Sequence, residues 1–589
     1  MENILQYILM AACPVMGALA TDAIAQPSAS AKAAKGELLY NGIQLPAQWP
    51  PRIHQVGTNV LPVPYLTNRP AVVPIDVGRQ LFIDDFLIEE TSLRRQFHYP
   101  QRYESNPVLK PETPTELGEF GEKEKDGNTK PMAAMISDGF CYDAKDKLYK
   151  LWYQGGWRDG TMIATSQDGL HWTRPQTDVE PGNNRVLPKR TKPMRHGTGI
   201  SFDPFTSDPS QRYKMLVYED KKTAAYTSPE GIHWKLRGEL PECGDNATAF
   251  YNPFRDKWVI SIRVQRSARN GRARNYREHA DFLQAISWSP LPEKASEILA
   301  GRSEEYEWAG TDPLDLPDPE MIAKIPKESS ENKDQRKLYG DPPQLYNLDA
   351  MAYESIMVGM FGILRGPTSG KLWDKLKCVK RNDLHLAYSR DGFYWDRPDR
   401  TPFLACSRKE GDWENGYLHS GVGLFTVVND QLWFYYSGWS GVGPKGSTTY
   451  AGASTGVAFL RRDGFASMDA GAKGGTLTTR PVRFKEKYLF VNADLPKGAL
   501  KVEILDGKGA VITPFTQDNS IAFTGDKTRQ RMTWKGASDL SGLAGKNVSF
   551  RFTLTQGSLY AFWVSPDQNG ASHGYLGAGA PGINGLVDQ

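Results

Sequence analysis

The chain is poor in the residues that build metal or disulfide scaffolds. Of its 589 residues, five are cysteine and nine are histidine, and no two cysteines have the C-x-x-C spacing of a zinc or redox site. No excess of one charge stands out either: the formal net charge is +3, with the two signs well mixed. A broad basic field that would bind nucleic acid or an anionic membrane is therefore not expected, and the predicted partner is small or neutral.

Long apolar runs are also missing, apart from one near the N-terminus. Residues 8–20 (ILMAACPVMGALA) are too few to span a bilayer, and residues 23–25 (AIA) fit a small-x-small cleavage site. We interpret residues 1–25 as a signal peptide and expect an exported protein, periplasmic or extracellular, without a membrane span. The segment before the run lacks Lys and Arg, unlike an ordinary signal peptide. Lipid attachment at Cys13 is the less favoured alternative.

Helical periodicity is almost absent, and short alternating strands take its place. Four stretches pair one strand with an aromatic-rich second strand across a polar turn, which is typical of β-hairpins. These stretches are residues 140–156, 201–220, 249–263 and 424–438.

A second phrase, S-x-[DE]-G-x-x-W, follows several hairpins. Its Ser and acid can accept hydrogen bonds from the backbone of the turn, its Gly permits a positive φ, and its Trp covers the apolar layer behind. It occurs at residues 166–172, 228–234 and 389–395. Repeated short antiparallel strands with a Trp at a fixed place are typical of propeller blades.

We therefore predict an all-β fold, a five-bladed β-propeller followed by a C-terminal β-sandwich. The repeat units fall near residues 131–190, 196–240, 245–330, 345–405 and 415–468. In the third unit, a Pro- and charge-rich insertion at 290–344 is expected to be a solvated loop, or else a rim element of the site. The predicted domains are an N-terminal extension at 26–74, the propeller at 75–469, where the strand LFIDDFLIEE helps to close the ring, the sandwich at 476–566 and a flexible tail at 567–589.

The chain resembles the five-bladed propeller glycoside hydrolases, the grouping that includes the invertase-like and arabinanase-like families. It is most similar to bacterial members related to glycosyl hydrolase family 32. The residues that carry the resemblance are 80–88 (QLFIDDFLI), 106–109 (NPVL), 137–140 (SDGF) and 151–154 (LWYQ). The Asn-Asp-Pro-Asn-Gly and Arg-Asp-Pro signatures of the family are missing, so architecture transfers better than activity.

The resemblance implies hydrolysis of glycosidic bonds by two carboxyl groups at the central funnel. The innermost strand of each blade opens there, so acids near its start should converge. Asp138 has the spacing from Gln154 that resembles the invertase-like nucleophile, and we assign it as nucleophile or base. Glu242 resembles the Glu-Cys acid motif and competes with Glu354 as the acid. The predicted orienting or pKa-tuning partners are Asp245 and Asp349.

Each acid also has a structural interpretation. Asp138 can start a turn before Gly139, Asp245 can cap a strand, and Glu242 can face solvent. Asp349 and Glu354 lie in an apolar stretch, where a carboxylate must be paired or hydrogen-bonded. The predicted substrate-binding residues are the two strand-start histidines and three aromatic side chains, for which core packing is the alternative: His196, His419, Tyr353, Trp157 and Trp439.

Cofactors and rival functions complete the set of predictions. No cofactor is expected, although a Ca²⁺ ion in the funnel is compatible with the sequence. The protein is predicted to be a monomer with a carbohydrate substrate. The rivals are a non-catalytic carbohydrate-binding propeller and a sialidase-like hydrolase, with Tyr353 as nucleophile and Arg263, Arg266 and Arg365 holding a carboxylate.

Overall fold

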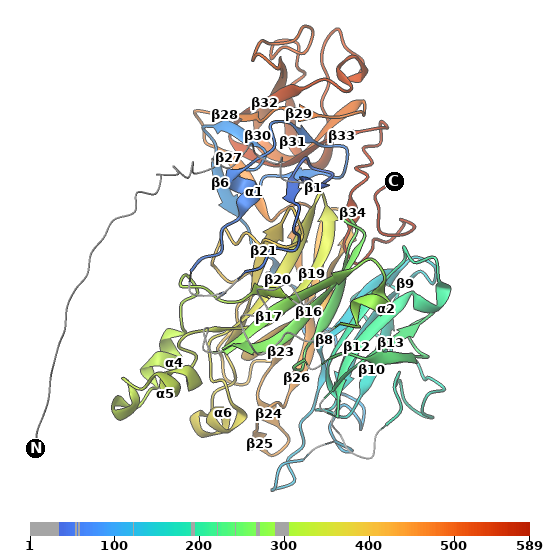
Figure 1. Ribbon diagram of the computed structural model, residues 1–589, viewed down its shortest axis with the longest axis vertical. Helices are drawn as coiled ribbons and strands as arrows, with labels where there is room; N and C mark the ends of the chain where they lie inside the picture. The colour runs from blue at the N-terminus through green and yellow to red at the C-terminus, as the bar shows by residue number, and fades with distance from the viewer. Residues whose placement is uncertain are drawn as a thin grey trace, which may run out of the picture.

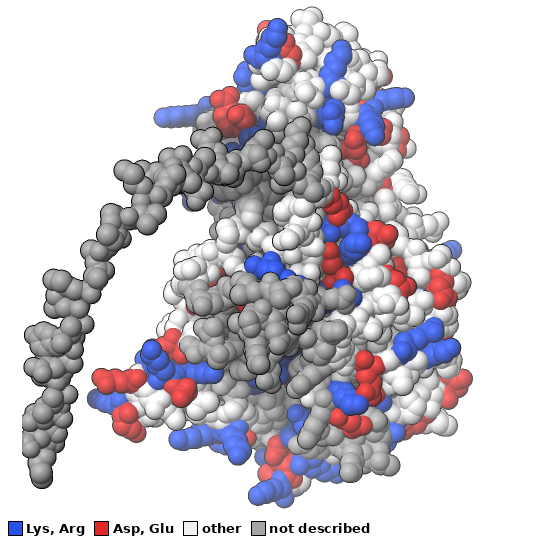
Figure 2. Space-filling view, viewed as in Figure 1, with Lys and Arg blue, Asp and Glu red and all other residues white. Residues whose placement is uncertain are grey.

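The chain is nearly all β-strand, with a large C-terminal sheet at one end and four-stranded units below it (Figure 1). The computed structural model describes residues 35–53, 56, 59–121, 123–189, 195–220, 222–241, 243–266, 271–288 and 306–589. Across these residues, no helix combines the length and apolar character needed to cross a membrane. Opposite charges intermingle on the described surface of the face in Figure 2, as expected from the composition.

Sheets of antiparallel strands follow one another along the chain. Three contain four strands in the orders β11-β12-β13-β14, β15-β16-β17-β18 and β21-β20-β19-β34; a seven-stranded sheet has the order β10-β9-β8-β22-β23-β26-β7. The strands of the first half are β8 Ala133–Asp143, β9 Leu148–Gly155, β10 Thr161–Ser166, β11 His196–Phe202, β12 Tyr213–Glu219, β13 Lys222–Ser228, β14 Lys235–Glu239, β15 Thr248–Asn252, β16 Lys257–Arg266, β17 Gly271–His279 and β18 Tyr306–Ala309. Those of the second half are β19 Gln344–Glu354, β20 Ile356–Leu364, β21 Asn382–Ser389, β22 Gly416–Val428, β23 Gln431–Trp439, β26 Ala453–Arg461 and β34 Tyr575–Leu576, with β7 Gln101–Arg102 added from the N-terminal side.

The strands β8, β11, β15, β19 and β22 lie side by side in a closed order. Each packs against the next, and β22 pairs with β8 in parallel at Gly421 and Val422. These strands also line one apolar cavity of about 70 Å³, to which Phe140, Ile200, Phe250, Met351 and Val422 each contribute from a different strand. The five strands therefore surround a common axis, and the cavity lies near their C-terminal halves.

The S-x-[DE]-G-x-x-W turns form the predicted hydrogen bonds and also connect neighbouring sheets. In the first, Ser166 Oγ accepts from Gly169 N at 2.8 Å, and Gly169 has a φ of 78°. Each turn receives a hydrogen bond from an aromatic side chain of a distant strand: Tyr435 Oη donates to Gly169 O, Trp152 Nε1 to Gly231 O and Trp308 Nε1 to Phe393 O, and the last two of these bonds join different sheets. The repeat thus fixes how one sheet packs on the next.

The C-terminal strands belong to one hydrogen-bonded sheet of eleven strands. β30 Tyr488–Asp506 is irregular near Leu495 and Leu500; its first part pairs with β33 Gly557–Ser565 and its second with β32 Val548–Thr555. The predicted sandwich is therefore joined into one sheet through this long strand. The other strands on this side are β27 Ala466–Ala470, β28 Gly475–Thr479, β29 Val482–Arg483 and β31 Phe523–Arg531.

N-terminal strands belong to this same sheet, which corrects the predicted boundary at residue 75. They are β3 Val73–Pro74, β4 Gln80–Leu81, β5 Ile88–Thr91 and β6 Arg94–Phe97, paired with β29, β33, β28 and β27. The stretch LFIDDFLIEE (81–90) therefore supports the C-terminal sheet and does not close the ring. Phe82 stacks on Phe562 inside the core of that sheet. It is β7 that adds an outer strand to the sheet of β22, β23 and β26.

Two further expectations need correction. The described part of the 290–344 insertion is structured: it includes β18, α4 Pro319–Ala323, η2 Lys327–Ser329 and α5 Lys333–Leu338, and its Asp315 forms a buried ion pair with Arg397. The segment 567–589 is not a loose tail. β34 extends the sheet of β19, Tyr142 N donates to Ala578 O, and Leu576 is fully buried.

Short elements complete the chain. They are β1 Lys35–Leu38 and β2 Gln44–Pro46, α1 Pro64–Thr67, η1 Pro209–Gln211, α2 Phe282–Ala285, α6 Gly370–Leu376, β24 Val442–Gly443 with β25 Gly446–Ser447, and η3 Ser541–Leu543. α6 and the β24–β25 hairpin lie at the bottom of the view, at the opposite end of the molecule from the C-terminal sheet (Figure 1).

Candidate functional site

Aromatic side chains gather where the inner strands begin. Tyr346 at the start of β19 and Tyr417 at the start of β22 exchange a hydroxyl hydrogen bond of 2.6 Å. Trp157 stacks on Tyr450 with centroids 4.0 Å apart and planes 3° from parallel. Trp373 of α6 makes edge contacts with Tyr417 and Tyr450, which places the cluster at the end of the axis away from the C-terminal sheet. We call these five side chains the aromatic cluster.

A buried lysine lies among these rings. Lys380 is 2% exposed, and its Nζ donates to Tyr450 Oη at 3.1 Å and lies 4.6 Å from the centroid of Tyr417. Burial, and then the nearby Arg272 and Arg158, lower the pKa of Lys380 to about 7. Its ammonium group therefore titrates near neutral pH.

Asp245 is the acid at this end that reaches solvent. Its side chain is 32% exposed, and Arg263 Nη1 lies 3.5 Å from its Oδ1. Its charge acts on the pKa values of Lys380, Tyr346 and His419, so it lies beside the aromatic cluster. A carboxylate in this position can meet a ligand without unfolding the strands.

Asp138 and Asp349 are both buried on inner strands. Asn347 Nδ2 donates at 2.7 Å both to Ser137 Oγ and to Asp349 Oδ2. Ser420 Oγ also donates to Asp349 Oδ2, at 2.7 Å. The structure thus places Asp349 in a buried polar chain that crosses three inner strands, β8, β19 and β22, and Asp138 follows Ser137 of this chain in the sequence.

Burial dominates the ionisation of both acids. Asp138 has no exposed surface; it accepts from Ile136 N at 2.9 Å and from Gln154 Nε2 at 3.0 Å, and desolvation still raises its pKa to about 8. The same cause raises the pKa of Asp349 to about 6. Asp138 is therefore neutral at pH 7, which does not suit the base or nucleophile predicted from the sequence.

His419 and Trp439 pack against the aromatic cluster. His419 is 1% exposed, lies 4.8 Å from Tyr417 between ring centroids, and neither ring nitrogen has a hydrogen-bond partner in the described structure. Burial and the charges of Lys380 and Arg274 lower its pKa to about 3, so the ring is neutral. Trp439 is fully buried, and its Nε1 also lacks a partner among the described residues.

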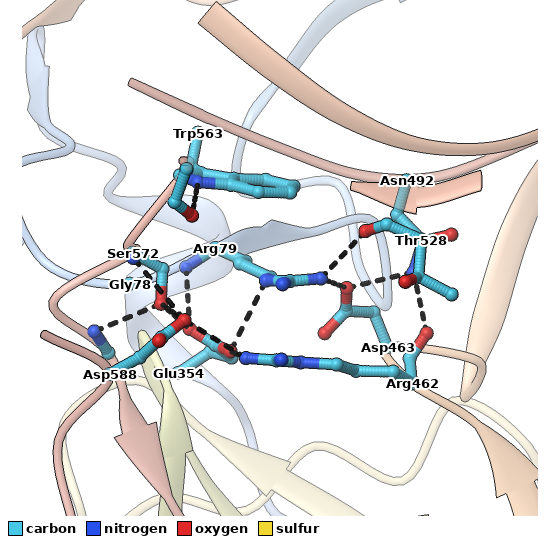
Figure 3. A network of polar contacts seen from close by, with 12 residues as sticks. Gly78, Arg79, Glu354, Arg462, Asp463, Asn492, Thr528, Trp563, Ser572 and Asp588 are labelled. Carbon is cyan, nitrogen blue, oxygen red and sulfur yellow. Dashed lines mark hydrogen bonds and ion pairs between the residues drawn. The ribbon is translucent and has the colours of Figure 1, made fainter. Parts of the chain in front are cut away.

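Glu354 and Tyr353 lie elsewhere, which corrects their predicted roles. They end β19, about 16 Å along the strand from Asp349 at the usual rise per residue. Figure 3 shows the Glu354 carboxylate between the Arg79 and Arg462 guanidiniums, with Ser572 donating to it at 2.7 Å. Tyr353 is fully buried and donates to Asp463 at 2.6 Å. Glu354 is therefore the carboxylate that pairs with two buried arginines, which is a structural role.

Among the described residues, the structure does not bring together those that the sialidase-like alternative requires. Its Tyr nucleophile is in the core, and Arg365 lies 3.7 Å from Asp383 rather than beside Arg263. Glu242 and the side chains of His196 and Arg266 lie outside the described residues; the backbone of His196 pairs with Tyr218.

Several residues of the site carried no signal in the sequence. Lys380 and Tyr450 lie in connections and Arg272 lies on β17, the third strand of its sheet, where neither the repeat nor the resemblance marks a residue. Tyr417 and Tyr346 could have been found, because each lies within three residues of a predicted site residue at the start of an inner strand.

No metal centre emerges from the described side chains. Among them, no group of three or more His, Cys, Asp or Glu could hold an ion. Cys141, Cys378 and Cys406 are buried thiols, and Cys243 contacts Thr223 Oγ1 at 3.1 Å. The absence of a cofactor, and a Ca²⁺ ion in the funnel, stay predictions.

Comparison with known proteins gives remote structural likeness only. No protein family model matches the chain, and no curated protein matches it. Among solved structures, a Bacteroides ovatus protein provisionally described as a glycoside hydrolase is 14% identical, with 62% of this chain and 97% of that chain covered and a TM-score of 0.36. An exo-beta-1,3-galactanase from Phanerochaete chrysosporium is 9% identical (78% and 99% covered, TM-score 0.32), and a thermostable family-43 glycoside hydrolase is 11% identical (58% and 96% covered, TM-score 0.33). At these scores, function has to be derived from the geometry of the chain itself.

Proposed function

We propose that the chain is a glycoside hydrolase built on a five-bladed propeller, with its site at the end of the axis where the inner strands begin. The supporting observation is that five inner strands pack in a closed order and bring Asp245, Lys380 and the aromatic cluster together. Stacked rings beside polar groups suit the flat faces and hydroxyls of a sugar. Export, a monomeric state and the family 32 grouping belong to the same proposal.

Asp245 acts as the ionised carboxylate in this proposal, replacing Asp138. Glycoside hydrolysis needs one ionised carboxylate to attack or activate water and one protonated acid to assist the leaving oxygen. Asp245 is exposed enough to meet a substrate and is paired with Arg263. Glu242, three residues earlier, is the proposed proton donor on the basis of the sequence.

Asp349 and Asp138 position the site from below. Asp349 accepts from Asn347, whose Oδ1 in turn accepts from Arg274 Nη2 at 2.9 Å. Arg274 also donates to the carbonyls of Asn246 and Tyr346, the residues next to Asp245 and within the aromatic cluster. Through Asn347 and Arg274, Asp349 therefore helps to fix the position of Asp245 relative to the aromatic cluster.

Release of reducing sugar from a panel of plant and algal glycans tests the proposal. Asp245→Asn and Glu242→Gln should each abolish a detected activity, by at least a hundredfold in kcat, with unchanged melting temperature. Lys235→Gln is the matched control, because Lys235 is exposed on β14. Full turnover by both acid variants would remove these residues from the mechanism.

A non-catalytic carbohydrate-binding propeller is the second candidate. It is favoured by the complete burial of Asp138 and near-complete burial of Asp349, which leaves Asp245 as the solvent-reaching acid among the described residues discussed above. Binding of a glycan without release of reducing ends, by wild type and Asp245→Asn alike, would decide for this candidate.

A further inference from the structure

We propose that the sugar bound at this site carries an anionic group, a carboxylate or a sulfate, and that Arg272 and Lys380 bind that group. The inference rests on the proposed carbohydrate site and specifies its substrate class. It also revises the expectation of a neutral partner, because a local cluster of charge can form in a chain whose total charge is close to balanced.

Arg272 and Lys380 contact the same ring. The guanidinium carbon of Arg272 lies 5.0 Å from the centroid of Tyr346, and Lys380 Nζ lies 5.4 Å from it. The two charges are therefore within roughly one Debye length, about 10 Å, of each other. Two like charges held so close repel unless an anion lies between or beside them.

Neither cation has a carboxylate partner among the described residues. Lys380 donates to the Tyr450 hydroxyl and Arg272 donates to Gln344 Oε1 at 2.8 Å, and neither forms an ion pair with a described carboxylate. Two other buried arginines are paired: Arg185 with Asp159 at 2.8 Å and Arg390 with Asp84 at 2.8 Å. An unpaired buried ammonium is costly, so a site that keeps one is suited to a ligand that supplies the missing charge.

Further cations surround the pair. Arg158 lies 5.4 Å from the ring of Trp157, Arg263 lies beside Asp245, and Arg274 is buried under Tyr346 and Asn347. The charges that act on the pKa of Lys380 are Arg272 and Arg158, which lower it, and Asp245, which raises it. Among the described side chains named here, cations therefore outnumber carboxylates at this end of the axis.

The same surroundings suit a sugar ring rather than a bare anion. Tyr450 stacks on Trp157 and is half-buried, so a hydroxyl and an aromatic edge accompany the cations. His419 offers two ring nitrogens without partners in the described structure, one a donor and one an acceptor in the neutral ring. A planar guanidinium binds carboxylate and sulfate oxygens in pairs, which orients such a sugar.

Matched acidic and neutral probes test the inference on the full chain. Oligogalacturonate is compared with its methyl ester, and sulfated carrageenan oligosaccharides with their desulfated forms, by calorimetry at low and high salt. Thermal shift with galacturonate, glucuronate and sugar sulfates is measured in parallel. The variants are Arg272→Gln and Lys380→Met, with Lys235→Gln as the control.

We expect at least one acidic probe to bind at least tenfold more tightly than its neutral counterpart, with affinity falling as salt rises. Arg272→Gln should remove most of that preference, whereas Lys235→Gln should keep it. Tighter binding of oligogalacturonate than of its methyl ester identifies the anionic group as a uronate carboxylate. Tighter binding of the sulfated than of the desulfated oligosaccharide identifies it as a sulfate. Because Arg272 is half-buried and its guanidinium contacts Gln344 and Tyr346 among the described residues, its variant should fold even if Lys380→Met does not.

Equal binding of acidic and neutral probes, no effect of Arg272→Gln, or no response to any acidic probe would overturn the inference. The experiments distinguish rejection of the anion-binding inference from rejection of the proposed hydrolase activity. A neutral glycan hydrolysed equally by wild type and both variants removes the anion subsite and keeps the enzyme. An acidic glycan bound through Arg272 but left uncleaved keeps the subsite and removes the enzyme.

Discussion

Glu354 and Arg79 form an ion pair in which both side chains have no exposed surface, with Arg79 Nε 3.4 Å from Glu354 Oε1. Arg79 belongs to the N-terminal segment that supports the C-terminal sheet, and Glu354 ends the inner strand β19. Arg462 and Asp588 extend the network, so segments from four parts of the chain meet in it (Figure 3). The pair joins the C-terminal sheet to the ring of inner strands.

Replacing Glu354 should therefore affect stability and leave the chemistry alone. Glu354→Gln removes the carboxylate charge that Arg79 and Arg462 share, leaving Asp463 and Asp588 as their partners, and should cost about 3–5 kcal/mol in the free energy of unfolding, measured by urea denaturation. Glu239→Gln breaks the exposed pair with Lys222 and should cost less than about 1 kcal/mol. A loss of kcat in fully folded Glu354→Gln would return this residue to the site.

Asp138 should make the protein less stable as pH rises. Its folded pKa of about 8 exceeds the ordinary 3.8, so the folded state binds the extra proton between these values. The stability gained from the neutral acid is complete below pH 4 and is lost as pH rises through 8. In Asp138→Asn this loss should disappear, making the variant relatively more stable at pH 9 than at pH 5, by up to about 4 kcal/mol.

Gln154 allows this substitution to fit. Its Oε1 is buried without a partner in the described structure, so turning its amide would let it accept from the new Asn or from a protonated acid. Urea midpoints of wild type and variant at the two pH values measure the effect. A constant difference between them at all pH values would show that Asp138 does not change its ionisation on folding.

For Lys380 we expect the opposite pH dependence of the free energy of unfolding. Its folded pKa of about 7 is below the ordinary 10.5, so the unfolded chain binds the extra proton between these values and stability rises with pH over that range. Lys380→Met removes this dependence, and its gain over wild type should be several kcal/mol larger at pH 6 than at pH 10. Parallel unfolding curves at both pH values, with the same difference between variant and wild type, would contradict the burial of an unpaired ammonium.

Gly231 should not tolerate a side chain. Its φ is 87°, and a Cβ would overlap the ring of Trp152, whose Nε1 donates to Gly231 O. Gly231→Ala should cost about 2–5 kcal/mol from strain and overpacking. Gly182 is the matched control: its φ is 81° and a Cβ there meets no atom within 4 Å, so Gly182→Ala should cost only about 1 kcal/mol. Equal melting temperatures would show that the turn does not fix the packing of the sheets.

Removing residues 571–589 tests the role of the C-terminal segment. It supplies Tyr575, Gly577 and Ala578 to the lining of the axial cavity, and Ser572 and Asp588 to the Glu354 network. The truncated chain should lose several kcal/mol of stability and bind a hydrophobic dye, because apolar surface and a strand edge become exposed. An unchanged melting temperature would restore the prediction of a flexible tail.

The repeated hairpins and turns could be predicted from the sequence, whereas strand pairings that occur only once could not. The hairpins and the S-x-[DE]-G-x-x-W turns follow from alternation and from residues that favour a positive φ, and Ser166 and Gly169 adopt the predicted bonds. The stretch 81–90 was predicted as one strand, but the structure has two short strands, β4 and β5, on either side of a turn, and both belong to the C-terminal sheet. Alternation fixes that a segment is extended, whereas its pairing partner depends on contacts hundreds of residues away.

Site residues were predicted with the same limit. Acids on the inner strands could be found, but Asp245 lies beside the aromatic cluster whereas Asp138 and Asp349 lie midway along β8 and β19. Glu354 was grouped with Asp349 because both belong to β19, although Glu354 ends that strand five residues further on. Lys380 could not be found, because its importance comes from the three tyrosine rings that the fold brings around it.

β7 pairs with β26 through Arg102 and Ala458. More than three hundred residues must therefore be synthesised after β7 before its pairing strand exists. The segment that covers the apolar end of the axis is made later still. During synthesis the inner strands therefore expose unpaired edges and an apolar interior, which are the surfaces that chaperones bind and that cause aggregation. The ring of inner strands is therefore completed only after residues 575–578 have been made, rather than as each repeat is translated.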